Sequence, residues 1–99
     1  MTTQEHILAF LHSQKHVLMK DFHLVSIALF GSYAEGKANE DSDIDLLVEF
    51  KKGTPNLSRK KSLLKQKIKN QFHLDVDICR EKYIKPYFKQ QILDSAIYV

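Results

Sequence analysis

The stretch that decides the fold is GSYAEGKANEDSDIDLLV, which occupies residues 31–48 and follows the aliphatic run Leu24–Phe30. A short apolar run that ends at a glycine is typical of a buried strand. Residues Asp43–Phe50 alternate between polar and apolar side chains and therefore predict a second strand with one face toward the core. Between the two strands we expect a short helical turn over Ser32–Gly36 and a polar loop over Lys37–Ser42.

The rest of the chain continues this alternation of strands and helices. Apolar residues at helical spacing predict helices, and a further segment in which apolar and polar residues alternate predicts one more strand. The additional expected elements are helices over Thr3–Lys20, Leu57–Phe72 and Glu81–Ala96 and a strand over Leu74–Cys79. The order α-β-α-β-α-β-α indicates an α/β (α+β) fold in which helices flank a small mixed sheet. We expect residues 1–99 to form a single domain.

Composition excludes several classes of protein. Hydrophobic residues make up 43% and charged residues 27% of the 99 residues, a globular and not a disordered balance. No apolar run approaches the roughly 20 residues that span a bilayer, and the N-terminus lacks the pattern of a signal peptide. A single cysteine, Cys79, excludes an internal disulfide and a cysteine-built zinc site. We therefore expect a cytoplasmic protein without membrane association.

Two short segments concentrate the carboxylates of a chain whose net charge is +3. On a strand, Asp43 and Asp45 lie on the same side, about 6–7 Å apart at the backbone. Neighbouring carboxylates raise each other's pKa unless a positive charge lies between them. A divalent cation with oxygen ligands is the natural counter-charge.

The predicted strand over Leu74–Cys79 repeats this pattern with Asp75 and Asp77. One such pair would be explained by a solvated strand face, but two pairs on neighbouring strands would bring three or four carboxylates together. A purely structural sheet avoids opposed like charges. Convergent carboxylates bind two Mg²⁺ ions in enzymes that transfer phosphoryl or nucleotidyl groups. Asp75 fits either a fourth ligand or a solvated strand start.

Gly31 and Ser32 form a candidate anion site between the first two strands. A glycine at the end of a strand, followed by a helix N-terminus, presents free backbone N–H groups to a phosphate. The chain contains neither a P-loop nor a dinucleotide-binding glycine motif. Ser32 and Glu35 also fit a capping box, with Ser32 at the N-cap, and this explains Glu35 better than a catalytic role does. For Ser32 the capping and phosphate roles are compatible.

Gly31-Ser32, ten intervening residues and Asp43-x-Asp45 resemble the signature of the polymerase-β-type nucleotidyltransferase superfamily. The short chain, the run SDIDLLV at residues 42–48 and the C-terminal segment 84–99 are similar to the minimal nucleotidyltransferases (MNT), the partners of HEPN toxins in toxin–antitoxin pairs. The resemblance covers nearly the whole chain. It implies the fold of a minimal nucleotidyltransferase core.

The resemblance assigns roles to individual residues. Asp43 and Asp45 would be the two metal-binding catalytic carboxylates, and Asp77 would be the third, which helps hold a second metal and activates the attacking hydroxyl. Gly31 and Ser32 would bind the β,γ-phosphates of the nucleotide.

This chain departs from the family pattern G-S-x-A-R-G at one position, because Glu35 stands where the family often has arginine. A carboxylate at that position would repel a triphosphate. Lys37, two residues further on, is the candidate substitute for nucleotide binding.

The resemblance also implies the reaction and the partner. AMP would be transferred from ATP, with Mg²⁺ bound at two sites, to a tyrosine hydroxyl of a cognate HEPN RNase toxin, and pyrophosphate would leave. The chain would act as the antitoxin in a hetero-oligomer. Ninety-nine residues hold only a catalytic core, so the acceptor must come from outside the chain.

Two other functions remain open at this point. Glu35 in place of arginine favours an antitoxin that neutralises its partner by binding alone. A free-standing enzyme acting on RNA or a small molecule is disfavoured because no acceptor domain is present.

Other patterns are explained without a function. The basic helix 57–72 is interpreted as a solvated face, so direct nucleic-acid binding is not expected. His12 and His16, four residues apart, are interpreted as a surface pair because no third metal ligand lies nearby.

Overall fold

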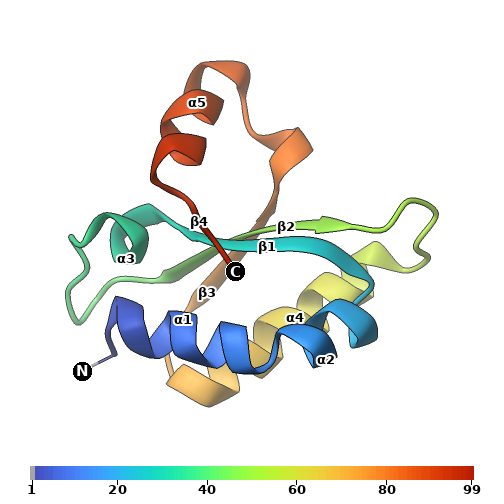
Figure 1. Ribbon diagram of the computed structural model, residues 1–99, viewed down its shortest axis with the longest axis horizontal. Helices are drawn as coiled ribbons and strands as arrows, with labels where there is room; N and C mark the ends of the chain where they lie inside the picture. The colour runs from blue at the N-terminus through green and yellow to red at the C-terminus, as the bar shows by residue number, and fades with distance from the viewer. Residues whose placement is uncertain (1) are drawn as a thin grey trace.

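The computed structural model describes residues 2–99, so only the first residue of the expected 1–99 domain lies outside it. Figure 1 shows a sheet with helices on both faces. The helices are α1 (Gln4–Ser13), α2 (Lys15–Asp21), α3 (Gly31–Glu35), α4 (Leu57–Phe72) and α5 (Pro86–Ser95), with a 3₁₀ helix η1 (Glu81–Tyr83). The strands are β1 (Leu24–Phe30), β2 (Ile44–Phe50), β3 (Val76–Arg80) and β4 (Ile97–Tyr98).

The sheet has four strands in the order β3-β2-β1-β4. β1 pairs antiparallel with β2 and with β4, whereas β2 and β3 run parallel because α4 connects them as a crossover. The mixed sheet expected from the sequence is therefore confirmed.

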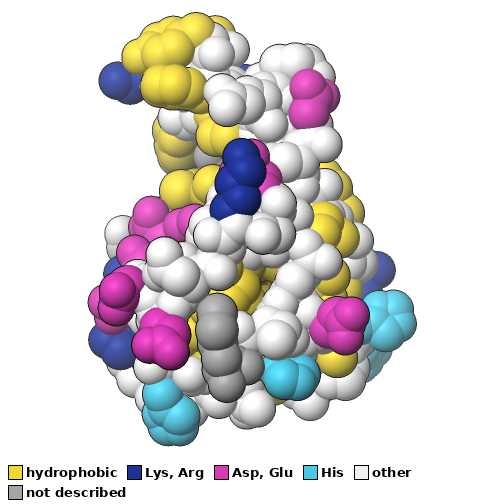
Figure 2. Space-filling model, turned by 90° about the vertical axis from the view of Figure 1, so that its left-hand side faces the viewer, with side chains coloured by type: hydrophobic (Ala, Val, Ile, Leu, Met, Phe, Trp, Pro, Cys, Tyr) yellow, Lys and Arg dark blue, Asp and Glu magenta, His cyan; other side chains and the backbone are white. Residues whose placement is uncertain are grey.

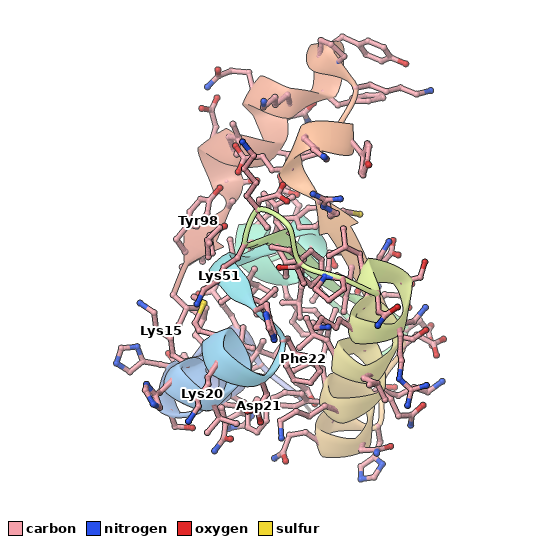
Figure 3. The ribbon with its side chains drawn as sticks, turned by 90° about the vertical axis from the view of Figure 1, so that its right-hand side faces the viewer. Lys15, Lys20, Asp21, Phe22, Lys51 and Tyr98 are labelled. Atoms are coloured by element: carbon pink, nitrogen blue, oxygen red, sulfur yellow. The ribbon has the colours of Figure 1, made fainter. Side chains whose placement is uncertain are left out.

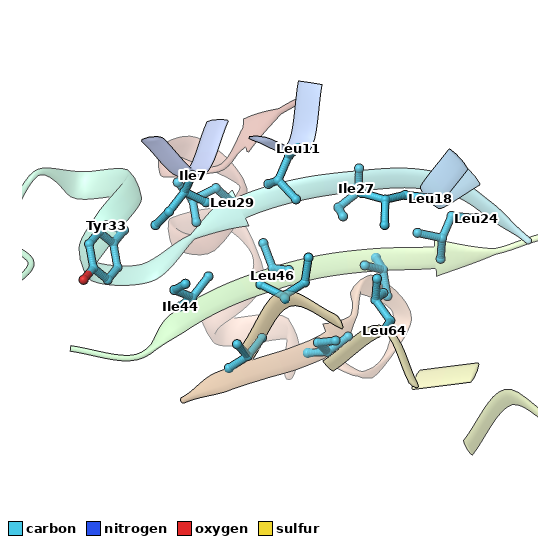
Figure 4. Close-up of a cluster of buried hydrophobic side chains, with 14 of the residues drawn as sticks. Ile7, Leu11, Leu18, Leu24, Ile27, Leu29, Tyr33, Ile44, Leu46 and Leu64 are labelled. Atoms are coloured by element: carbon cyan, nitrogen blue, oxygen red, sulfur yellow. The ribbon is translucent and has the colours of Figure 1, made fainter. Parts of the chain in front are cut away.

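The main core lies between the sheet and helices α1, α2 and α4. Side chains at alternate positions of β2, from Ile44 to Phe50, are buried on this face, as the alternation predicts. Figure 4 shows Ile7, Leu11 and Leu18 packed against the first two strands from one side, with Leu64 of α4 contributing from another. These helices hold β1 and β2 rigidly and so fix the loop that connects them.

The opposite face of the sheet is only partly covered. Ala28 and Leu47, a cross-strand pair of β1 and β2, are buried on it, although alternation alone would expose them. α5 lies over this face in Figure 1, and α3 lies beside it at the end of β1. The partly covered face is the one that carries Asp45 and Asp77, because side chains at alternate strand positions share a face.

The N-terminal helix is interrupted, contrary to the single helix expected over Thr3–Lys20. α1 ends at Ser13, whose hydroxyl donates to the Phe10 carbonyl at 2.9 Å, and α2 begins at Lys15. A serine that bonds back to the preceding turn competes with helix continuation. His12 and His16 therefore lie on different helices, and both are exposed.

The C-terminal region also differs from the expected helix over Glu81–Ala96. η1 is followed by extended backbone at Ile84 and Lys85, and α5 begins only at Pro86. A residue before proline avoids the helical region, which explains the break. The chain leaves α5 at Ser95 and pairs with β1 through β4, an element that the sequence analysis missed.

The third strand begins two residues later than the predicted Leu74, at Val76, and extends to Arg80. Arg80 anchors the end of this strand to its neighbour. Its Nε and Nη2 atoms donate to Oε1 of Glu49 at 3.0 and 2.7 Å. The guanidinium also lies 5.7 Å from the Phe50 ring centroid and 5.2 Å from that of Tyr83.

We expect Arg80→Lys to lower the free energy of unfolding by about 1 kcal/mol, because an ammonium cannot keep the forked hydrogen bonds and the stacking. The matched variant Lys69→Gln breaks the exposed Lys69–Asp75 pair, whose atoms lie 3.2 Å apart. It should change the free energy of unfolding by only about 0–0.5 kcal/mol. Urea unfolding at pH 7 measures both. Equal losses would contradict a special role for Arg80.

Candidate active site

The parallel register of β2 and β3 places Asp45 directly opposite Asp77. Neighbouring strands lie about 4.8 Å apart, and paired residues point to the same face of the sheet. Asp45 is half-buried and Asp77 is exposed. The two carboxylates therefore lie side by side at one end of the sheet, as the sequence analysis expected for neighbouring strands.

Asp43 lies just outside the strand on which it was predicted. β2 begins at Ile44, whose N–H donates to the carbonyl of Asp75 at 2.9 Å, so Asp43 ends the preceding loop and is exposed. Its charge nevertheless acts on Asp45. The loop thus brings a third carboxylate toward the pair.

Crowding of these carboxylates changes the acidity of Asp45. Burial, followed by the negative charges of Asp77 and Asp43, raises the pKa of Asp45 from 3.8 to about 6. Burial disfavours the ionised form, and each neighbouring negative charge disfavours it further. A cation bound between these groups would reverse the effect and favour the ionised form.

The donor set fits a hard divalent cation in kind, since all its groups are carboxylates. Within residues 2–99, however, no three His, Cys, Asp or Glu side chains form a ready-made metal cluster. Mg²⁺ is commonly held by one or two carboxylates together with the phosphates of a substrate. Asp45 and Asp77 match that arrangement.

Gly31 brings the backbone against Asp45. A Cβ built on Gly31 would overlap the Asp45 carboxylate, and the backbone has φ +72°. Both the space and the left-handed conformation require glycine. The turn after β1 and the carboxylate of β2 are thus packed together, which places the Gly31-Ser32 segment beside the candidate metal ligands.

The predicted capping box is wrong. α3 begins at Gly31 with Phe30 as its N-cap, and no side chain caps it. Ser32 therefore occupies the first turn of α3 and not the N-cap, because the N-cap is Phe30, two residues earlier than the S-x-x-E pattern suggests. Glu35 is the last residue of α3 and is exposed.

Lys37 follows the left-handed Gly36 that ends α3, and its backbone N–H donates to the Ser32 carbonyl at 2.9 Å. Its side chain is exposed. Lys37 therefore lies near the Gly31-Ser32 turn along the backbone, and its role toward the nucleotide stays a prediction.

Asp75 has different surroundings from Asp77. Its carboxylate pairs with Lys69 of α4 at 3.2 Å, and it precedes the first residue of β3. The interpretation of Asp75 as a solvated residue at the strand start agrees with this position.

A cavity of about 380 Å³ adjoins Asp77 and was not anticipated from the sequence. Asp77 and Cys79 of β3 line one side, and Phe88 and Ile92 of α5 line another. Lys61 of α4 also borders it. The helical spacing of apolar residues predicted a helix over Glu81–Ala96 and gave no signal for a cavity.

Comparison with known proteins finds related sequences over nearly the whole chain. Residues 14–99 match the family profile of the nucleotidyltransferase domain. The chain is 34% identical over 99 residues to the protein adenylyltransferase MntA of Thermococcus cleftensis, with 100% of this chain and 98% of the relative covered.

Solved structures share the fold. One, described as a "putative minimal nucleotidyltransferase", superposes with a TM-score of 0.79 at 31% identity, covering 97% of this chain and 95% of the other. A crystal structure of a toxin–antitoxin with AMP-PNP gives a TM-score of 0.66 at 28% identity, covering 87% of this chain and 69% of the matched one. Among the described residues, no helix is long and apolar enough to cross a membrane.

Proposed function

Because the chain belongs to the nucleotidyltransferase domain family, we propose that it is an antitoxin that transfers AMP from ATP to a partner toxin. The observation that carries the proposal is the register of Asp45 with Asp77 beside the Gly31 turn. Relatives named as protein adenylyltransferases and the structural likeness to a toxin–antitoxin support it.

The acceptor in this proposal is a tyrosine of a HEPN-type RNase toxin. The acceptor oxygen attacks the α-phosphorus of ATP, and a new P–O bond forms. The bond from the α-phosphorus to the oxygen that bridges to the β-phosphate breaks, and pyrophosphate leaves with that electron pair. The hydroxyl proton passes to the Asp77 carboxylate and from there to solvent.

Each site residue has a defined task. Asp43, Asp45 and Asp77 hold Mg²⁺, which neutralises the charge of the phosphates when it is bound. Backbone N–H groups at Gly31 and Ser32 bind the β,γ-phosphates, because the start of α3 presents donors without helical partners. Lys37 supplies positive charge near this turn.

We expect the toxin encoded beside this gene to gain one or more AMP units when it is coexpressed with the wild-type chain. The double variant Asp43→Asn, Asp45→Asn should leave the toxin unmodified, since the metal-binding carboxylates are gone. Intact-mass spectrometry of the toxin measures this directly. An unmodified toxin with the wild-type chain would contradict the proposal.

A second function has one observation in its favour. Glu35 is exposed at the end of α3, close to the phosphate turn, where it would repel a triphosphate. If the antitoxin acts only by occluding its partner, the double variant Asp43→Asn, Asp45→Asn should still neutralise the toxin. Survival of cells that coexpress the toxin and this variant, with no change in toxin mass, would select this function.

A further inference from the structure

Residues 81–95, comprising η1 and α5, form a protrusion that we call the aromatic lobe. Tyr83, Tyr87 and Phe88 are 71%, 70% and 49% exposed, respectively. None of the ten residues of α5, all of which the structure describes, is fully buried. Figure 2 shows hydrophobic side chains gathered at the end of the molecule where α5 lies, with a basic side chain beside them. Such a grouping of aromatic side chains is typical of protein interfaces.

Three lysines lie among these aromatic residues in the sequence of the lobe. Lys82, Lys85 and Lys89 are spaced along the lobe, and the Lys82 ammonium lies 5.3 Å from the Tyr83 ring centroid.

The two acidic residues of the lobe already have hydrogen-bond partners. Glu81 accepts from the Tyr98 hydroxyl at 3.3 Å, and Asp94 accepts from Gln90 at 2.6 Å near the end of α5. Residues 82–89, which carry the exposed rings, contain three lysines and no Asp or Glu. This part of the lobe is therefore cationic and aromatic, and its electrostatic complement is an acidic surface.

The aromatic lobe also borders the site. The cavity of about 380 Å³ extends from Asp77 to Tyr83, Ile84 and Phe88. A protein bound on the outside of the lobe would therefore have a route to the candidate catalytic carboxylate along apolar walls. A phenol suits such a route, because its ring is apolar and only its tip is polar.

We propose that the aromatic lobe is the docking surface for the acceptor protein, that the docked face of that protein is acidic, and that the acceptor side chain reaches Asp77 through this cavity. The inference rests on the proposed function, because an acceptor exists only if the chain transfers a nucleotide to another protein. It adds the chemistry of the partner surface and its place on this chain.

Charge selects this occupant over a second copy of the chain. In a symmetric dimer each patch faces its own copy. Lys85 and Lys89 of one copy would then approach the same lysines of the other, which costs free energy. An acidic partner meets the same lysines favourably.

The test compares two double charge reversals in the full chain. Lys85→Glu, Lys89→Glu alters the lobe without touching the cavity lining. Lys15→Glu, Lys20→Glu makes the same change of charge on α2, where both lysines are exposed and far from the lobe, as Figure 3 shows. Tyr87→Ala removes an exposed ring without a change of charge.

Binding to the partner toxin of the proposed function is measured by calorimetry with each variant. We expect the lobe reversal and Tyr87→Ala each to weaken binding about tenfold or more, and the α2 reversal to weaken it less than about threefold. Binding by the wild-type chain should also weaken as salt rises.

Two further readouts separate this inference from the proposed function. Affinity for α,β-methylene ATP with Mg²⁺ should be the same for all variants, while the KM for the toxin in AMP transfer rises only in the lobe variants. Unchanged toxin binding by the lobe variants overturns the inference even if transfer continues. Absence of transfer by the wild-type chain overturns the proposed function and with it the acceptor role of the toxin, while lobe-dependent binding would still support the lobe as the surface on which the toxin docks.

Other occupants give distinct results. If the lobe variants alter self-association in sedimentation while toxin binding is unchanged, the lobe is a dimer interface and the inference is wrong. If they lose binding to a single-stranded RNA but keep toxin binding, the lobe is a nucleic-acid surface and the inference is wrong.

Discussion

Replacing Asp45 with asparagine is expected to lower the rate of AMP transfer about a thousandfold, while the variant remains folded. Asp45 lies opposite Asp77 and against the Gly31 turn, so it is the carboxylate most tightly built into the site. An amide keeps the shape but loses the charge that holds a metal ion. Metal-assisted stabilisation of phosphoryl charge is worth several kcal/mol, and each 1.4 kcal/mol is tenfold in rate.

The same substitution should stabilise the metal-free protein at pH 7. In the folded chain burial and the charges of Asp77 and Asp43 raise the pKa of Asp45 to about 6, against 3.8 ordinarily. A raised carboxyl pKa means that the folded state binds the proton more tightly than the unfolded state. Stability is therefore lost as the pH rises from about 4 to 6, and the loss is complete above that window.

Asparagine cannot ionise, so Asp45→Asn escapes this loss. Because the group is only partly buried and is screened by solvent, we expect a gain of about 1 kcal/mol in the free energy of unfolding at pH 7. The gain should shrink toward zero as the pH falls below the ordinary value of 3.8, where the wild-type carboxyl becomes protonated in both states. Urea unfolding in the presence of a chelator at the two pH values measures it.

Asp41→Asn is the matched control, because it removes an equal charge from the exposed loop before β2. We expect it to retain transfer and to show no such pH-dependent gain. A folded Asp45→Asn variant with undiminished transfer would contradict the catalytic assignment. Destabilisation of that variant at pH 7 would contradict the inference that burial and neighbouring carboxylates make the ionised Asp45 unfavourable in the folded protein.

The part of the site between β1 and β2 follows from local sequence. The aliphatic run before Gly31 and the alternation after Asp43 each specify a strand, and the short connection makes them neighbours. Asp45 and Gly31 could thus be placed together from two patterns that both lie within residues 24–50. The start of α3 could not, because the S-x-x-E pattern indicates an N-cap at Ser32, whereas the helix begins at Gly31 with Phe30 as its N-cap.

The pairing of Asp45 with Asp77 depends on contacts distant in sequence. Alternation shows that Asp77 faces away from the core, but the register of two parallel strands is set by how α4 packs beneath them. The aromatic lobe was missed for a related reason. Ile84, Phe88 and Ile92 have helical spacing, yet Pro86 separates Ile84 from α5, and the remaining apolar side chains line a cavity instead of a core.

Gly31→Ala is expected to lower the rate of transfer about a hundredfold, since a displacement of about 1 Å in a catalytic group costs that much. The new methyl group would overlap the Asp45 carboxylate and drive it from its place opposite Asp77. The positive φ of 72° adds backbone strain of about 1–2 kcal/mol for any residue with a Cβ. We therefore predict losses of both activity and stability.

Gly53→Ala separates these two effects. Gly53 has φ +80°, and a Cβ there meets nothing within 4 Å, so the variant carries the strain without the overlap. In thermal unfolding we expect Gly53→Ala to lose only the stability that the strain costs and Gly31→Ala to lose at least as much, while only Gly31→Ala loses transfer and affinity for ATP with Mg²⁺. Equal transfer rates in the two variants would show that the close approach of the turn to Asp45 has no part in the chemistry. A large loss of transfer in Gly31→Ala alone would show that Gly31 is needed for the position of the Asp45 carboxylate as well as for the shape of the turn.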